Sequence, residues 1–63
     1  MNYGLYNEID CVYLTHPTVG IWHTEDLSVA EDMLQSCKEY VRSLGFDESK
    51  FYIIDLDNKK KVQ

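Results

Sequence analysis

The first 37 residues contain no lysine and no arginine, although they contain six Asp and Glu residues. The whole chain of 63 residues has 11 acidic and 6 basic residues, a net charge of −5, and half of the bases are the three lysines at 59–61. Such a negative field disfavours nucleic acid and anionic membranes as partners of the body and favours a basic protein surface. Small domains are also often acidic for solubility alone, and this explanation stays open.

Long apolar runs are missing as well, and cysteine is scarce. No stretch of 18 consecutive apolar residues is present, and no basic region precedes an apolar run at the start of the chain. We therefore expect no membrane span, no signal peptide and a cytoplasmic location. Cys11 and Cys37 both lie among apolar residues, so two buried thiols in a reducing compartment are expected rather than a disulfide.

The motifs of common active sites and metal sites are not found. The three glycines are too scattered to form a phosphate-binding loop. Cys11, His16 and His23 are of zinc-ligand types, but their spacings, C-x4-H and H-x6-H, match no compact zinc site. Catalysis by cysteine is disfavoured, because an apolar environment raises the pKa of a thiol and lowers its reactivity. We expect no catalytic residue, no metal, no cofactor and no enzymatic activity.

Apolar residues recur with the period of an α-helix between residues 28 and 44. They form one stripe, which consists of Ala30, Met33, Leu34, Cys37, Val41 and Leu44. Thr24, Asp26 or Ser28 can cap the amino end of this helix. Gly45 is placed to end it in a left-handed conformation, with Phe46 folding back onto Val41.

Runs rich in β-branched and aromatic residues predict strands at 9–15, 19–23 and 51–56. The turn sequence His16-Pro17-Thr18 predicts a hairpin between the first two, and Asp57-Asn58 predicts a tight turn after the third. Residues 1–8 have no clear period and are expected to be an irregular lead-in or an edge strand. Residues 59–63 are expected to be a basic tail or a short edge strand.

The order β-β-α-β, with a short fourth strand as an option, predicts a single α+β domain over residues 1–63. One amphipathic helix should pack on one face of a small three- or four-stranded sheet. A right-handed crossover predicts strand order 2-1-3, with the second and third strands parallel. Because one helix covers one face, we expect apolar and aromatic surface to be left over on the other.

Candidate binding residues are of two kinds. The acidic candidates surround the predicted helix start and are Glu25, Asp26, Glu31 and Asp32. The chain has more aromatic residues than so small a core needs. The aromatic candidates among them are Tyr3, Tyr6, Tyr13, Trp22 and Tyr52. Tyrosine is favoured at interfaces because it combines apolar area with a polar tip. Trp22 and Tyr13 fit a place in the core equally well.

The segments HTEDLSVAED and SLGFDESKFYIIDLDN and the base-free first 37 residues resemble small acidic bacteriophage-encoded proteins of the anti-CRISPR and anti-defence type. The resemblance rests on the overall plan of the chain. It implies a compact sheet with one helix that acts in the cytosol of a host cell and blocks a nucleic-acid-handling protein by mimicking phosphate charge. The lysines at 59–61 depart from this pattern, since a phosphate mimic does not need them.

The sequence thus predicts a small acidic protein-binding module or inhibitor that docks a negative, aromatic-bearing surface on a basic protein. The alternative is a structural domain that forms a homodimer through its sheet.

Overall fold

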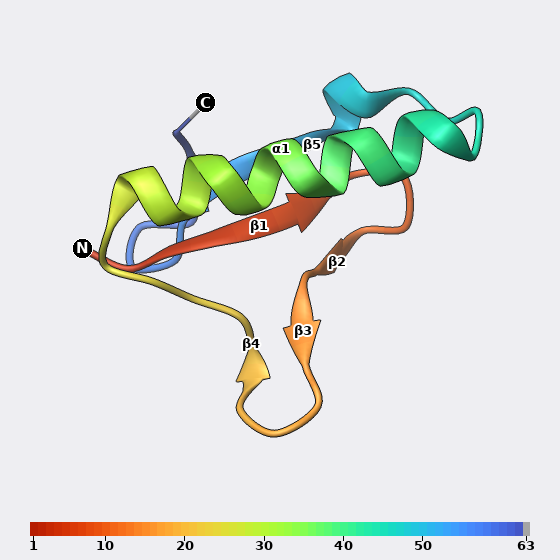
Figure 1. Ribbon diagram of the computed structural model, residues 1–63. Coiled ribbons are helices and arrows are strands. Elements are labelled where there is room, and N and C mark those ends of the chain that lie inside the picture. Colours follow the sequence, from red (N-terminus) through yellow and green to blue (C-terminus); the bar gives the residue numbers. More distant parts are fainter. Residues whose placement is uncertain (63) are drawn as a thin grey trace.

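The computed structural model describes residues 1–62 and shows an α+β fold in which one helix lies across one face of an antiparallel sheet (Figure 1). The elements in chain order are β1 (Tyr3–Asn7), β2 (Val12–Tyr13), β3 (Thr15–His16), β4 (Gly20–Ile21), α1 (Leu27–Ser43), the 3₁₀ turn η1 (Glu48–Lys50), β5 (Phe51–Asp55) and β6 (Lys60–Lys61). The main sheet has the order β2-β1-β5-β6, and β3 and β4 form a separate pair. The predicted fold class is confirmed.

Strand β1 lies inside the sheet, so the expectation that residues 1–8 are irregular or at an edge is wrong. It pairs with β2 on one side and, over all five of its residues, with β5 on the other. Leu5 stands opposite Ile53, and both side chains are 0% exposed. Leu5 is the one aliphatic residue of β1, so the strand has little apolar signal of its own. Its pairing with β5 stabilises it instead.

The predicted strand 9–15 is broken into a turn and two short strands. Cys11 has a φ of 56°, and this left-handed residue reverses the chain before β2. The predicted hairpin around His16-Pro17-Thr18 is present as β3 and β4, which project away from the main sheet (Figure 1).

The predicted strand order 2-1-3 with a parallel pair is wrong. Every strand pair within residues 1–62 is antiparallel, and segment 19–23 is not part of the main sheet. Directly after segment 19–23, an isolated β-bridge joins Thr24 to Tyr3 of β1. The strand order differs from the prediction because β1 pairs with β5. The sequence pattern assigns this position to the strand predicted at 9–15.

Both predicted ends of the helix are found in α1. Of the three candidate caps, Asp26 is the N-cap, and its carboxylate accepts hydrogen bonds from the Ser28 amide at 2.9 Å and the Ser28 hydroxyl at 2.7 Å. At the other end Gly45 has a φ of 85° and donates to the Arg42 carbonyl, while the Phe46 amide donates to the Val41 carbonyl. These two bonds are those of a Schellman motif.

The predicted apolar stripe of α1 is buried for most of its length. Ala30, Leu34 and Val41 are buried, and Met33 and Cys37 are half-buried. Leu44 is the exception, because it is the C-cap, where the chain turns away from the sheet, and it is 55% exposed. The Phe46 side chain is also 55% exposed, although its backbone bond to Val41 forms.

The predicted turn at Asp57-Asn58 is present and is organised by Asp55, which is 6% exposed. The Asp55 carboxylate accepts from the Asp57 amide at 2.9 Å and from the Asn58 side chain at 2.8 Å. Lys59, with a φ of 60°, supplies the left-handed residue. The chain then returns as β6, which pairs with β5, so of the two expectations for residues 59–63 the edge strand holds for Lys60–Lys61. Gln63 lies outside the described residues.

Candidate functional site

The four acidic candidates lie at the amino end of α1, and all are exposed. The hydrogen bonds from Ser28 engage the Asp26 carboxylate and lower its pKa. Its charge serves the helix start. Glu25, Glu31 and Asp32 remain as acidic candidates for contact with a partner.

Two of the five aromatic candidates belong to the edge of the core. Trp22 and Tyr3 are half-buried and pack against the cluster formed by Leu5, Ala30, Leu34 and Ile53. The Tyr3 backbone also exchanges two hydrogen bonds with Thr24, of 2.8 and 2.9 Å. These two rings therefore contribute mainly to packing.

The other three aromatic candidates form a row across β2, β1 and β5. Tyr6 stands opposite Tyr13 on one side and Tyr52 on the other, with ring centres 5.0 and 5.8 Å apart. Leu5 and Ile53, which contribute to the core beneath α1, are the chain neighbours of Tyr6 and Tyr52. The tyrosine row therefore lies on the sheet face away from the helix.

Lysines from the end of the chain cover this tyrosine row. The Nζ of Lys59 lies 5.4 Å from the centre of the Tyr13 ring, and that of Lys61 lies 4.9 Å from the Tyr52 ring. The Tyr52 hydroxyl donates a hydrogen bond of 3.1 Å to Glu8. Burial, followed by this bond, raises the pKa of Tyr52, and burial also raises the pKa of Tyr6. The tyrosine row thus already has contacts with lysine and glutamate side chains of the same chain.

The acidic candidates and the tyrosine row lie on different faces of the molecule. The acids sit on and before α1, which covers one face of the sheet, whereas the row occupies the other (Figure 1). The nine candidate residues do not form one continuous surface.

A groove beside α1 is the feature that the sequence pattern missed. One hollow, of about 330 Å³, is lined by Leu14, Ser36, Cys37, Tyr40, Val41 and Phe51. A second, of about 180 Å³, is lined by Asn7, Val12, Tyr13, Leu14, Thr15 and Phe51. Because the two share Leu14 and Phe51, we call them together the α1–β2 groove. All lining residues are uncharged.

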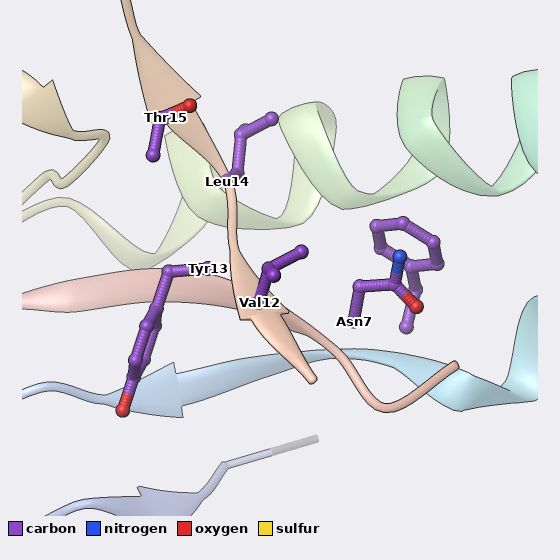
Figure 2. A pocket seen from close by; sticks show the side chains of 6 residues that line it. Asn7, Val12, Tyr13, Leu14 and Thr15 are labelled. Carbon is purple, nitrogen blue, oxygen red and sulfur yellow. The ribbon is translucent and has the colours of Figure 1, made fainter. Parts of the chain in front are cut away.

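Figure 2 shows how β2 and the residues after it border this groove. The Leu14 side chain points toward α1, whereas the Tyr13 ring points away from the helix. The Leu14 amide donates to the Leu5 carbonyl and its carbonyl accepts from the Trp22 amide, so this short segment is fixed to β1 and to the residue that follows β4. Since β2 pairs for only two residues, the flank of α1 on that side stays open.

A second apolar stripe of α1 is the sequence signal that would have indicated the groove. It has the spacing i, i+4, i+7 and i+11 and consists of Met33, Cys37, Tyr40 and Leu44. It overlaps the buried stripe and is offset to one side of it. Tyr40, which is 67% exposed, is its most accessible member and was not among the aromatic candidates.

Acidic side chains border the groove on α1. Asp32 and Glu39 are exposed and stand four residues before and three residues after Ser36, so all three lie on one side of the helix. The bases Lys38 and Arg42 emerge from the other side, and Arg42 is bonded to Glu48. The groove is thus uncharged inside, and two acidic residues of α1 neighbour its lining residue Ser36.

The cysteines and histidines show no common site. Both thiols are free; Cys37 is half-buried, and burial raises its pKa, but Cys11 is exposed, so the expectation of two buried thiols is wrong for Cys11. His16 accepts a hydrogen bond from the Thr18 amide, and His23 contacts the Ile21 carbonyl, each within its own turn. Within residues 1–62 no three His, Cys, Asp or Glu side chains are grouped to hold a metal ion.

No helix within residues 1–62 has the length and apolar character needed to cross a membrane. The comparisons with family models, with curated proteins and with solved structures give no match. Function is therefore inferred from the geometry alone.

Proposed function

We propose that this protein is a non-enzymatic binding module that docks the groove side of α1 on a basic surface of another protein. The observation that carries the proposal is the position of Asp32 and Glu39 beside an open, uncharged groove. Protein interfaces combine an apolar centre with a polar rim, and charges on the rim steer association with partners of opposite charge.

The size and lining of the groove support a protein partner. Its two hollows, of about 330 and 180 Å³, lie at or below the lower end of the range for small-molecule pockets. Two of its lining apolar side chains, Val12 and Tyr40, are exposed. Such exposed apolar patches are typical of sites that bind other proteins.

The proposed surface is negative and bears an aromatic side chain, as the sequence predicts, but the aromatic residue is a different one. Glu25, Glu31 and Asp32 remain, Glu39 joins them, and Tyr40 replaces the tyrosine row. Such a module can act as an inhibitor of a nucleic-acid-handling protein, which is the function that the resemblance to phage anti-defence proteins implies. We place it in the cytosol, where free thiols stay reduced.

A homodimer formed through the sheet has less support. The two edge strands, β2 and β6, have two residues each, and β6 consists of Lys60 and Lys61. Short, lysine-bearing edges hinder pairing between sheets. The open sheet face carries the tyrosine row, over which Lys59 and Lys61 already lie.

Affinity capture with matched charge variants tests the proposal. Asp32→Asn and Glu39→Gln together remove the two acidic charges next to Ser36 of the groove and leave the Asp26 cap intact. The control variant, Asp47→Asn and Asp57→Asn, removes two exposed charges elsewhere. Each protein is immobilised and exposed to extract of the cell that encodes it, at about 50 mM and about 500 mM salt.

We expect the wild type and the control variant to retain the same basic protein at low salt, and the groove-side variant to lose most of it. Circular dichroism must show that all three proteins are folded. Equal retention by the two variants, or equal loss, would overturn the proposal, because the position of the charges would then not matter.

A further inference from the structure

We infer that the α1–β2 groove receives an amphipathic helix of the partner, which places two apolar anchor side chains in the two hollows and cationic side chains opposite Asp32 and Glu39. This inference rests on the proposed function and names the partner segment by its chemistry.

The interior of the groove selects apolar anchors. The polar side-chain groups that line the larger hollow are the Ser36 hydroxyl, the Tyr40 hydroxyl and the Cys37 thiol. In the smaller hollow the Asn7 amide is already engaged, since it donates to Asp10 at 3.1 Å and accepts from the Ile9 amide at 2.9 Å. A buried polar group of a partner would find few hydrogen bonds here and would be penalised.

The shape of the groove favours a helix as the occupant. Its α1 wall consists of Ser36, Cys37, Tyr40 and Val41, which form two pairs at i and i+4, and rows with this spacing are those through which two helices pack side by side. These four residues extend for about 8 Å along α1. Ser36 and Cys37 have small side chains, so a second helix can approach there, while Tyr40 is exposed enough to contact it.

The rim charges specify where the partner carries its cations. Asp32 and Glu39 are seven residues apart, which is two helical turns or about 10 Å. Lysine or arginine at positions i and i+7 of the partner helix matches this spacing. A second copy of this chain fits less well, because its own α1 would bring Asp32 and Glu39 toward the same acids.

Fluorescence anisotropy with a designed peptide tests the inference. The probe is a fluorescein-labelled helical peptide of leucine and lysine, with leucine at i, i+3, i+4 and i+7 and lysine elsewhere. One control peptide has the same composition in scrambled order, and another has glutamate in place of lysine. We expect the wild-type protein to bind the patterned peptide at least about tenfold more tightly than either control.

Two matched variants assign the binding to the groove. Ser36→Arg adds a long cation to the groove, and Gln35→Arg adds the same charge at the neighbouring exposed position outside it. We expect Ser36→Arg to weaken peptide binding about tenfold or more, because the side chain fills the groove, and Gln35→Arg to change it less than about threefold.

Each other outcome overturns the inference. If the two variants bind equally, the groove is not used; if the scrambled peptide binds as well as the patterned one, the occupant is not an amphipathic helix. If sedimentation shows that the wild type is a dimer and Ser36→Arg a monomer, a second copy fills the groove. If Ser36→Arg no longer binds the peptide but still captures the cellular partner, the partner does not place a helix in the groove. That result would overturn this inference and leave the proposed acidic docking surface intact.

Discussion

The Nζ atom of Lys61 lies 4.9 Å from the centre of the Tyr52 ring, on the sheet face away from α1. Lys59 makes the same kind of contact with Tyr13. A cation is attracted to the negative face of an aromatic ring, so these lysines tie the end of the chain to the tyrosine row. They stabilise the sheet, which explains why an otherwise acidic chain carries them.

This contact predicts a difference between two neighbouring lysines. Lys61→Ala should lower the melting temperature by about 2–4 °C, because it removes the cation from the Tyr52 ring. Lys60→Ala makes the same charge change on the same strand, on the other face of the sheet, and should have a smaller effect. Thermal denaturation followed by circular dichroism measures both. Equal shifts would show that net charge, and not the ring contact, is responsible.

The N-cap of α1 predicts a second pair of variants. Asp26→Ala removes the acceptor of both hydrogen bonds from Ser28 and should lower the melting temperature by about 4–8 °C. Asp26→Asn keeps an acceptor oxygen and is an equally good cap, so it should remain close to the wild type. A large loss in Asp26→Asn would mean that the charge of Asp26 matters beyond the cap.

Three hydrogen-bonded aspartates predict that acid destabilises the fold. Bonds from Ser28, Ser49 and Asn58 lower the pKa values of Asp26, Asp47 and Asp55 respectively. Because the folded protein binds these protons less readily than the unfolded chain does, the stabilisation is complete above the unfolded pKa, about 4, and is lost as the pH falls below it.

Urea denaturation at a series of pH values checks this expectation. The midpoint should be nearly constant between about pH 5 and 7 and should fall below about pH 4. In Asp26→Asn the fall should be shallower, because one of the three groups no longer titrates. A midpoint that rises toward pH 3 would contradict the assigned hydrogen bonds.

The two thiols predict a footprint of the groove. Cys11 is exposed and should react rapidly with Ellman's reagent, whereas Cys37 is half-buried with a raised pKa and should react more slowly. Cys37 lines the groove and Cys11 does not. The patterned peptide should therefore slow the reaction of Cys37 in Cys11→Ser and leave that of Cys11 in Cys37→Ser unchanged. Protection of Cys11 alone would place the peptide elsewhere.

The helix was predictable because its signals are local. The apolar stripe, the N-cap and the Gly45 terminus each depend on residues within a few positions of one another; the stripe and the terminus are found, and the cap is Asp26, one of three candidates. Leu44 departs from the stripe for an equally local reason, since the Schellman turn begins there.

Strand β1 was not predictable because it depends on contacts between distant residues, and the second apolar stripe of α1 indicates only the helix side of the groove. Leu5 is buried by Ile53 and the helix, and nothing between residues 1 and 8 indicates this. The tyrosine row needs the register that places Tyr6 between Tyr13 and Tyr52. The groove exists because β2 stops after two residues and leaves Cys37 and Tyr40 uncovered, which is a tertiary outcome.

The central claim is that the groove side of α1 is the binding surface, and a nuclear magnetic resonance titration tests it most directly. Backbone amide shifts of the ¹⁵N-labelled protein are followed as the unlabelled leucine–lysine peptide is added. We predict that the largest changes map to Leu14, Phe51 and residues 32–43 of α1, with little change at Tyr6 and Tyr52. Largest changes on the tyrosine row, with α1 unaffected, would contradict it.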